Sequence, residues 1–141
     1  VGRPVTGMAP PPKVACSLLT TAQVTAALAA TVGGGRQMTK EVCQWSEQAK
    51  SGDDQVKVQV TLTTPERYNK FKTAGSVTVT AVEHLGDDAY YSAQTADNTQ
   101  VALCLRKGEA AVIVHAFGGK KTAAEYQSME KAIAEAVLPA L

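Results

Sequence analysis

The residues best suited to proton transfer or metal binding are a histidine and two neighbouring acids. His84 precedes Asp87 and Asp88 by three and four positions, so an imidazole and two carboxylates lie close together along the chain. Such a group could act as acid and base in catalysis or hold a metal ion. The intervening Leu85-Gly86 is equally typical of a polar turn at the end of a strand, and we favour the turn.

Other candidates for catalysis are weaker. The segment Gly118-Gly119-Lys120-Lys121-Thr122 could attract an anion at a helix start, but Lys121 interrupts the Gly-Lys-Thr of a phosphate loop and Val114 replaces its first glycine. The sequence contains no Gly-x-Ser-x-Gly nucleophile motif, and its cysteines and histidines lack zinc-site spacing. We therefore predict no catalytic residue, no metal and no cofactor.

Aromatic side chains and the second histidine are the candidates for ligand binding. Trp45, Tyr90 and Tyr91 could line a groove, and His115 lies on the same hairpin as a run of small apolar residues. The alternative is that Trp45 and one tyrosine belong to the core, that the other tyrosine is half exposed, and that His115 is a partly buried structural residue.

The first helix that must position these residues has a clear start. Thr20 and Gln23 form a capping box, and Leu19 and Val24 stand at the positions of a hydrophobic staple. The glycines at 33–35 are expected to end the helix.

Alternating residues predict strands. Residues 41–47 and 55–63 form a hairpin around a Ser-Gly-Asp-Asp turn at 51–54. A short helix should follow, with Thr64 as N-cap and Pro65 at its first position. Two further strands are predicted at 76–83 and 89–94.

A last hairpin of residues 100–106 and 109–117 is expected around Lys107-Gly108, with Arg106 opposite Glu109. Both of its faces are apolar, so cover is required on two sides.

The final helix should begin with the capping box of Thr122 and Glu125 and end at Pro139. Its apolar stripe includes Tyr126 and Ile133, while Glu130, Lys131 and Glu135 are expected to face solvent. The predicted fold is α+β, an antiparallel sheet of about five to six strands with helices packed on it, in the order α-ββ-α-ββββ-α.

Composition excludes some classes of protein. The chain has 14 Lys and Arg against 13 Asp and Glu, which is a poor fit to nucleic-acid binding, and no apolar run is long enough to span a membrane. Residues 1–13, rich in Pro and Gly, are predicted to form a flexible tether before a single α+β domain at 14–141. We expect any signal peptide to be absent from this sequence.

The pairing of the three cysteines bears on whether the protein lies in an oxidising or a reducing compartment. A Cys16–Cys43 bridge would join the start of the first helix to the first strand, and a Cys43–Cys104 bridge is the second choice. Three reduced thiols in a cytosolic core remain an alternative, because three is odd. In either bridged case we expect an oxidising, extracytoplasmic compartment. With the first bridge, Cys104 would be a buried thiol.

Several short motifs occur together in an order that resembles a known family. They are Cys16-Ser-Leu-Leu-Thr20, Cys43-Gln-Trp45, Leu85-Gly-Asp-Asp-Ala-Tyr90 and the Lys107-Gly108 hairpin. The chain is similar to secreted bacterial proteins of unknown function, mostly actinobacterial lipoproteins. The resemblance implies an extracytoplasmic domain, pairing of Cys16 with Cys43, and kinship with the PsbP-like sandwich and the extracellular sensor domains of bacterial kinases. The chain departs from the family in its additional Cys104 and in lacking a lipid-attachment cysteine.

These observations predict a non-catalytic extracytoplasmic binding or sensor-like module. Its partner would be a small ligand, a cell-envelope component or a protein. The alternative is a small extracytoplasmic enzyme built on His84, Asp87 and Asp88, or on His115.

Overall fold

The computed structural model describes residues 14–48, 52–73, 78–93 and 101–141. The predicted tether, 1–13, lies outside the described residues, as do the ends of several predicted strands. The helices and strands are α1 (Thr21–Leu28), β1 (Arg36–Thr39), β2 (Val42–Ser46), β3 (Lys57–Thr63), α2 (Pro65–Lys72), β4 (Thr78–Ala81), β5 (Asp88–Ala93), β6 (Val101–Lys107), β7 (Ala110–Phe117) and α3 (Ala123–Val137). Short 3-10 helices occupy Ala15–Ser17, Gly52–Asp54 and Leu138–Ala140.

The strands form one antiparallel sheet in the order β1-β2-β3-β7-β6-β5-β4, which confirms the predicted α+β class. The sheet has seven strands instead of five or six. The additional strand is β1, a short edge strand whose four residues are all exposed. Its sequence has no apolar alternation, so the signal on which strand prediction depends is missing.

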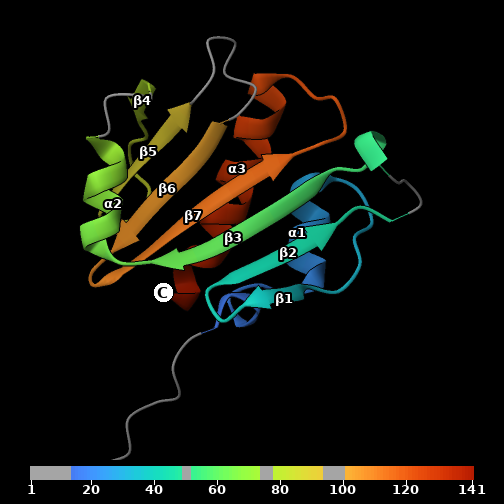
Figure 1. The fold of residues 1–141 in the computed structure, drawn as a ribbon, viewed down its shortest axis with the longest axis horizontal. Helices are drawn as coiled ribbons and strands as arrows, with labels where there is room; N and C mark the ends of the chain where they lie inside the picture. The colour runs from blue at the N-terminus through green and yellow to red at the C-terminus, as the bar shows by residue number, and fades with distance from the viewer. Residues whose placement is uncertain (1–13, 49–51, 74–77, 94–100) are drawn as a thin grey trace, which may run out of the picture.

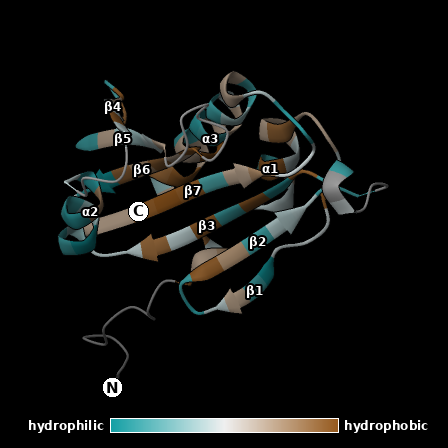
Figure 2. Cartoon of the chain, turned by 45° about the horizontal axis from the view of Figure 1, so that its top comes forward, coloured by the Kyte–Doolittle hydropathy of each residue, from teal (hydrophilic) through white to brown (hydrophobic). Residues whose placement is uncertain are grey.

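Helices cover the two faces of the sheet unequally. In Figure 1, α1 and α3 lie together behind the sheet, and α2 lies on the other side near one end. The prediction that both faces of the β6–β7 hairpin need cover is therefore confirmed. Figure 2 shows α2 mostly in the colour of hydrophilic residues, whereas β6 and β7 are largely hydrophobic.

The face under α1 and α3 holds the main core. The inward residues of β3, β6 and β7 alternate with residues of the other face, and Trp45 and Cys43 of β2 join them. Buried residues of the main core include Val24, Leu28, Val58, Val60, Leu103, Leu105, Val112, Val114, Ile133 and Val137.

The first helix begins as predicted and ends earlier. Thr20 Oγ1 accepts a hydrogen bond from the Gln23 amide, and Gln23 Oε1 accepts one from the Thr20 amide. Ala29 ends the helix in a left-handed conformation, with φ 54°. The glycines at 33–35 have another use, because a Cβ on Gly35 would lie 2.8 Å from Cys43 Sγ and 2.9 Å from the Trp45 ring.

The last hairpin has a register that differs by two residues from the prediction. Lys107 pairs with Ala110 and Arg106 pairs with Ala111, so Arg106 does not lie opposite Glu109. The loop is Gly108-Glu109, and Gly108 has φ 60°. Asp87 Oδ2 accepts the Gly108 amide at 2.6 Å, a tertiary contact invisible to local pairing rules. A shift of two keeps every side chain on its predicted face.

The prediction that Glu130 on α3 faces solvent is wrong. It is fully buried, at 0% exposure. Its Oε2 accepts a hydrogen bond from the Ala116 amide of β7 at 2.9 Å, and Oε1 has no partner within the described part of the chain. Burial raises the pKa of this carboxyl to about 9, against the opposing effect of the Ala116 hydrogen bond. The carboxyl is therefore neutral at pH 7.

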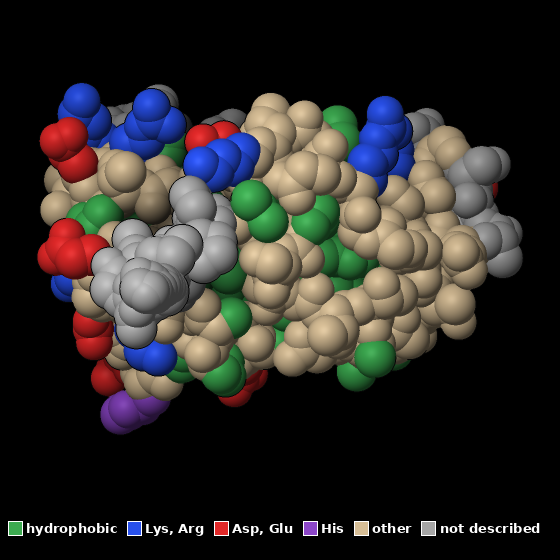
Figure 3. All heavy atoms as spheres, turned by 90° about the horizontal axis from the view of Figure 1, so that it is seen from below, with side chains coloured by type: hydrophobic (Ala, Val, Ile, Leu, Met, Phe, Trp, Pro, Cys, Tyr) green, Lys and Arg blue, Asp and Glu red, His purple; other side chains and the backbone are tan. Residues whose placement is uncertain are grey.

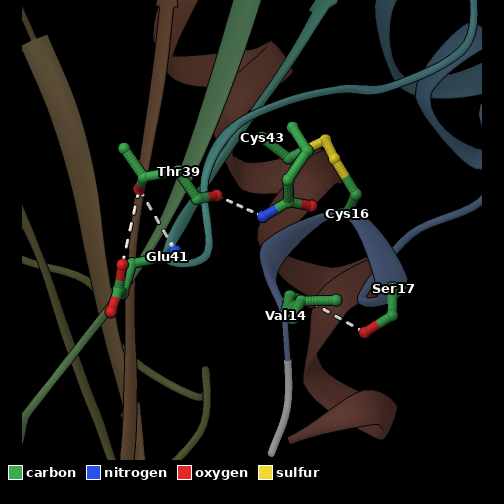
Figure 4. Close-up of a disulfide and its surroundings, with 7 residues drawn as sticks. Val14, Cys16, Ser17, Thr39, Glu41 and Cys43 are labelled. Atoms are coloured by element: carbon green, nitrogen blue, oxygen red, sulfur yellow. Dashed lines mark hydrogen bonds between the residues drawn. A yellow bond between two sulfur atoms is a disulfide. The ribbon is translucent and has the colours of Figure 1, made fainter.

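Cys16 and Cys43 form a disulfide, with their Cα atoms 5.0 Å apart. Figure 4 shows the bridge joining the short helix Ala15–Ser17 to β2. Cys104 is a free, buried thiol, so Cys43–Cys104, the second choice, is excluded.

Candidate functional site

One row of directly paired residues crosses all seven strands on the face opposite the main core. Each member lies opposite the next across the sheet, so their side chains share one face. From β1 to β4 the row is Thr39, Val42, Thr61, Ile113, Cys104, Tyr90 and Ala81.

Helix α2 covers Cys104 and Tyr90 in one half of this row, whereas Ala81 at the edge of that half is exposed. Tyr68 packs in a small core with Tyr90, Cys104 and Ala111. The rings of Tyr68 and Tyr90 are 4.9 Å apart in an edge arrangement, and the Tyr90 hydroxyl donates to the Tyr68 carbonyl at 2.9 Å. The ring contact and the hydrogen bond between Tyr68 and Tyr90 together hold α2 over the sheet at β5 and β6.

Asp88 fixes the other side of α2. Its Oδ2 accepts from the Tyr68 hydroxyl at 2.7 Å and from Lys72 Nζ at 2.9 Å. Partial burial raises the pKa of Asp88, but the hydrogen bonds from Tyr68 and Lys72 and the charge of Lys72 outweigh it, so the net pKa is lowered. Burial and the Asp88 contact raise the pKa of Tyr68, which keeps its hydroxyl a donor.

The other half of the row forms the floor of a groove of about 380 Å³. Val42, Thr61 and Ile113 lie along this floor, and all three are half-buried. Residues of the β1–β2 turn form one wall and residues of α2 form the other. The full lining is Thr39, Glu41, Val42, Thr61, Leu62, Thr63, Arg67, Phe71 and Ile113.

Two side chains of α2 give the groove its chemical character. Phe71 is 44% exposed, and Arg67 lies one helical turn before it on the same side of the helix. Within the described part of the chain Arg67 takes part in no ion pair. On the opposite wall, Thr39 Oγ1 donates to Glu41 Oε2 at 3.4 Å and accepts the Glu41 amide at 3.2 Å, as Figure 4 shows.

Exposed large apolar residues are few. Among the described residues, the large apolar side chains that stand out are Met38 and Phe71; Phe71 lines the groove, and Met38 is next in sequence to Thr39, which also lines it. Figure 3 views the molecule of Figure 1 from below, and hydrophobic side chains show there as scattered patches between backbone atoms and other side chains.

The structure places the predicted ligand-binding aromatics in different environments. Trp45 is 1% exposed in the main core, and Tyr90 is fully buried under α2. Tyr91 points to the opposite face from Tyr90, where its hydroxyl donates to the Gln127 carbonyl of α3 at 3.1 Å. The structure thus divides the three between two cores.

His115 lies on the groove face, two residues from Ile113 along β7. It pairs with Gln59, whose side-chain amide donates to Gln44 at 2.9 Å, and its ring is 5.1 Å from that of Phe117. Burial lowers the pKa of His115, so its imidazole is neutral at pH 7. His115 therefore shares the face of the groove but is not among the residues that line it.

The predicted acid–base cluster is not assembled into one site. Asp87 accepts the Gly108 amide of the last hairpin, and Asp88 is engaged by Tyr68 and Lys72. His84 is exposed, with a left-handed φ of 62°. Among the described residues, no group of three His, Cys, Asp or Glu side chains could hold a metal ion.

Cys104 lies in the covered half of the row and pairs with Ile113 of the open half. It is 3% exposed, and burial raises the pKa of its thiol to about 11, against a lowering hydrogen bond with Tyr90. A neutral, enclosed thiol is a poor nucleophile.

Sequence reasoning missed Arg67 and Phe71. The signal that could have found them is the composition of α2, eight residues long with Tyr68 as its one buried side chain. So short and polar a helix cannot cover a sheet face of seven strands, which leaves part of that face open beside its exposed residues.

Comparison of the chain with protein-family models, curated proteins and solved structures found no match. The resemblance to secreted bacterial proteins therefore remains a prediction from the motifs. Among the described residues no helix combines the length and the apolar character needed to cross a bilayer.

Proposed function

We propose that this protein is a non-catalytic extracytoplasmic binding module whose ligand lies in the groove between α2 and the β1–β2 turn. The observation that supports this most directly is the row of paired residues that α2 covers on one half and leaves open on the other. An apolar floor with a few polar groups at its walls is the usual make-up of a small-ligand site.

The proposed compartment follows from the Cys16–Cys43 disulfide. Such bridges persist in oxidising surroundings and are rare in the reducing cytosol. The bridge also ties the segment before α1 to β2, the strand that supplies Val42 to the groove floor.

The proposal of a non-catalytic role follows from what the groove contains. Its titratable side chains are Glu41 and Arg67, on opposite walls, and its hydroxyls belong to threonines. Covalent catalysis needs a nucleophile activated by an adjacent base that a third group orients. Among the described residues, the groove lining holds no serine, cysteine, lysine or histidine, and Thr39 Oγ1 donates only a long hydrogen bond of 3.4 Å to the Glu41 carboxylate. The ligand would therefore be bound and released unchanged.

A titration with the neutral probe 1-octanol tests the groove. We expect amide chemical-shift changes in two-dimensional NMR spectra to centre on Val42, Thr61, Ile113 and Phe71. Phe71→Ser should weaken octanol binding several-fold, because a wall residue loses its apolar ring.

Met38→Ser is the matched control, since Met38 is another exposed large apolar residue and does not belong to the groove lining. Shifts confined to another surface, or equal losses in both variants, would overturn the assignment of the groove. The protein is also incubated with model substrates for hydrolysis. Turnover that His84→Ala or His115→Ala abolishes would contradict the non-catalytic role.

A further inference from the structure

The two walls of the groove carry opposite charges. Arg67 stands on the α2 wall and Glu41 on the wall of the β1–β2 turn. Arg67 is the charged residue of α2 in the groove lining, since Lys72 of the same helix is paired with Asp88 away from the groove. A bound ligand therefore meets the positive charge of Arg67 at the α2 wall and the negative charge of Glu41 at the other.

The two charged side chains differ in the hydrogen bonds and ion pairs that they form within the protein. Glu41 accepts a hydrogen bond from the Thr39 hydroxyl. The Arg67 guanidinium has five donors and forms no ion pair with another described residue. A guanidinium beside an apolar wall such as Phe71 is suited to a planar or tetrahedral oxyanion, which it can bind through two parallel hydrogen bonds.

Between the walls the floor is apolar apart from Thr61. Val42 and Ile113 flank Thr61 along the row of paired residues, and Phe71 stands over the same end of the groove as Arg67. An alkyl or similar apolar chain would remove these side chains from water, whereas a small inorganic anion would leave them exposed.

We infer that the ligand is an amphipathic anion, with a carboxylate or phosphate head bound by Arg67 and an apolar chain lying over Val42 and Ile113. The inference rests on the proposed binding function of the groove and specifies its ligand class. Glu41 sets the direction, because it repels an anionic head from the β1–β2 end and so directs it to α2.

A set of probes with one chain and different heads tests the inference. Octanoate, octyl phosphate, 1-octanol and octylammonium are titrated separately into the whole protein below their micelle concentrations, with inorganic phosphate as a head without a chain. We expect octanoate and octyl phosphate to bind about tenfold more tightly than octanol, and inorganic phosphate to cause no saturable shift. The two anions together show whether a carboxylate or a phosphate is preferred.

Variants at the two walls separate head from chain. Arg67→Gln should erase the preference for octanoate over octanol, and Arg67→Lys should retain part of it. Glu41→Gln should leave octanoate binding equal or tighter. Arg36→Gln is the matched control, because Arg36 is an exposed arginine on β1 outside the groove lining, and it should keep the preference.

The outcomes distinguish this inference from the proposed function. If octanol shifts the groove residues and octanoate binds no more tightly, or if octylammonium binds best, the anionic ligand class is wrong while the groove remains the site. If no eight-carbon probe shifts the groove residues, the proposed function itself fails. Amide spectra of each variant without probe show whether the fold is intact.

Discussion

The two faces of the sheet are made by the same strands and yet differ in how completely they are covered. On one face, α1 and α3 bury Leu103, Val114 and their neighbours to 0% exposure. On the other, α2 buries Tyr90 and Cys104, and Ile113 remains half-buried beside the groove. The difference lies in the helices, since α3 has 15 residues and a long apolar stripe whereas α2 has 8 and is mainly polar.

This comparison predicts which residues determine the stability of the protein and which determine ligand binding. Fully enclosed residues contribute stability in proportion to the apolar surface removed from water. Half-covered apolar residues contribute less, and their remaining exposed surface is available to a ligand. Mutations on the first face should therefore change the free energy of unfolding, and mutations on the second should change mainly binding.

The largest expected effect comes from Glu130 on the enclosed face. Its folded-state pKa of about 9 lies above the ordinary value of 4.5, so the folded protein holds a proton that the unfolded chain releases. The contribution of this carboxyl to stability is therefore greatest below about pH 4.5 and falls by about 1.4 kcal/mol per pH unit as the pH rises toward 9. The neutral amide of Glu130→Gln should remove up to about 4 kcal/mol of that decline between pH 5 and pH 8.

Urea unfolding at a series of pH values measures this effect. Glu135→Gln is the matched control, since Glu135 is an exposed glutamate on the same helix, and its profile should follow the wild type. A wild-type stability that is flat between pH 5 and pH 8, or that rises, is incompatible with a buried neutral carboxyl.

The disulfide should have the next largest effect. Replacing Cys16 and Cys43 by serine opens a loop whose ends are 27 residues apart, which corresponds to a loss of about 3.5 kcal/mol in the chain-entropy model. Thermal unfolding with and without reductant measures it. Cys104→Ala should respond to reductant as the wild type does, whereas an unaltered wild-type melting temperature under reduction would contradict the bridge.

Removal of the Tyr68 hydroxyl should have a smaller effect, confined to the α2 side. Tyr68→Phe deletes one hydrogen bond to Asp88, which keeps Lys72, so we expect a loss of about 1 kcal/mol. Amide hydrogen exchange should quicken in α2. Tyr126→Phe is the comparison, because it deletes a hydroxyl that donates to the Gly118 carbonyl on the α3 side. In this variant the amides of α2 should exchange as in the wild type.

The elements with strong local signals could be predicted from the sequence. The capping boxes of Thr20 and Thr122 and the alternation of β3 give the helix starts and strand faces, because these signals involve neighbours within a few residues. The favoured Cys16–Cys43 bridge is confirmed as well. Its prediction required one assumption, that the segment before the first helix lies near the first predicted strand.

Features that depend on distant contacts could not be predicted. Edge strand β1 exists because β2 offers free backbone groups, and no residue pattern within it signals pairing. Glu130 appears solvent-facing by sequence, but the Ala116 amide of β7 gives it a buried partner. The groove arises where α2 stops short of β2 and β3, so only the assembled sheet brings Arg67 toward Val42 and Thr61.

The smallest effect tests the comparison most directly, because one substitution is made on both faces. Ile133→Val removes a methyl group from a fully buried residue of α3 and should cost about 1 kcal/mol, since the cavity is surrounded by core residues. Ile113→Val removes the same group from the groove floor, where water or ligand can fill the space, and should cost about 0.3 kcal/mol or less. Urea unfolding at fixed pH measures both. Because valine keeps the branched Cβ of isoleucine, strand preference changes little at position 113. At position 133, in α3, the helix propensities of isoleucine and valine differ by no more than a few tenths of a kcal/mol, so most of the difference reports burial. Equal costs would mean that the floor of the groove is as enclosed as the core, and the two faces would then no longer divide stability from binding.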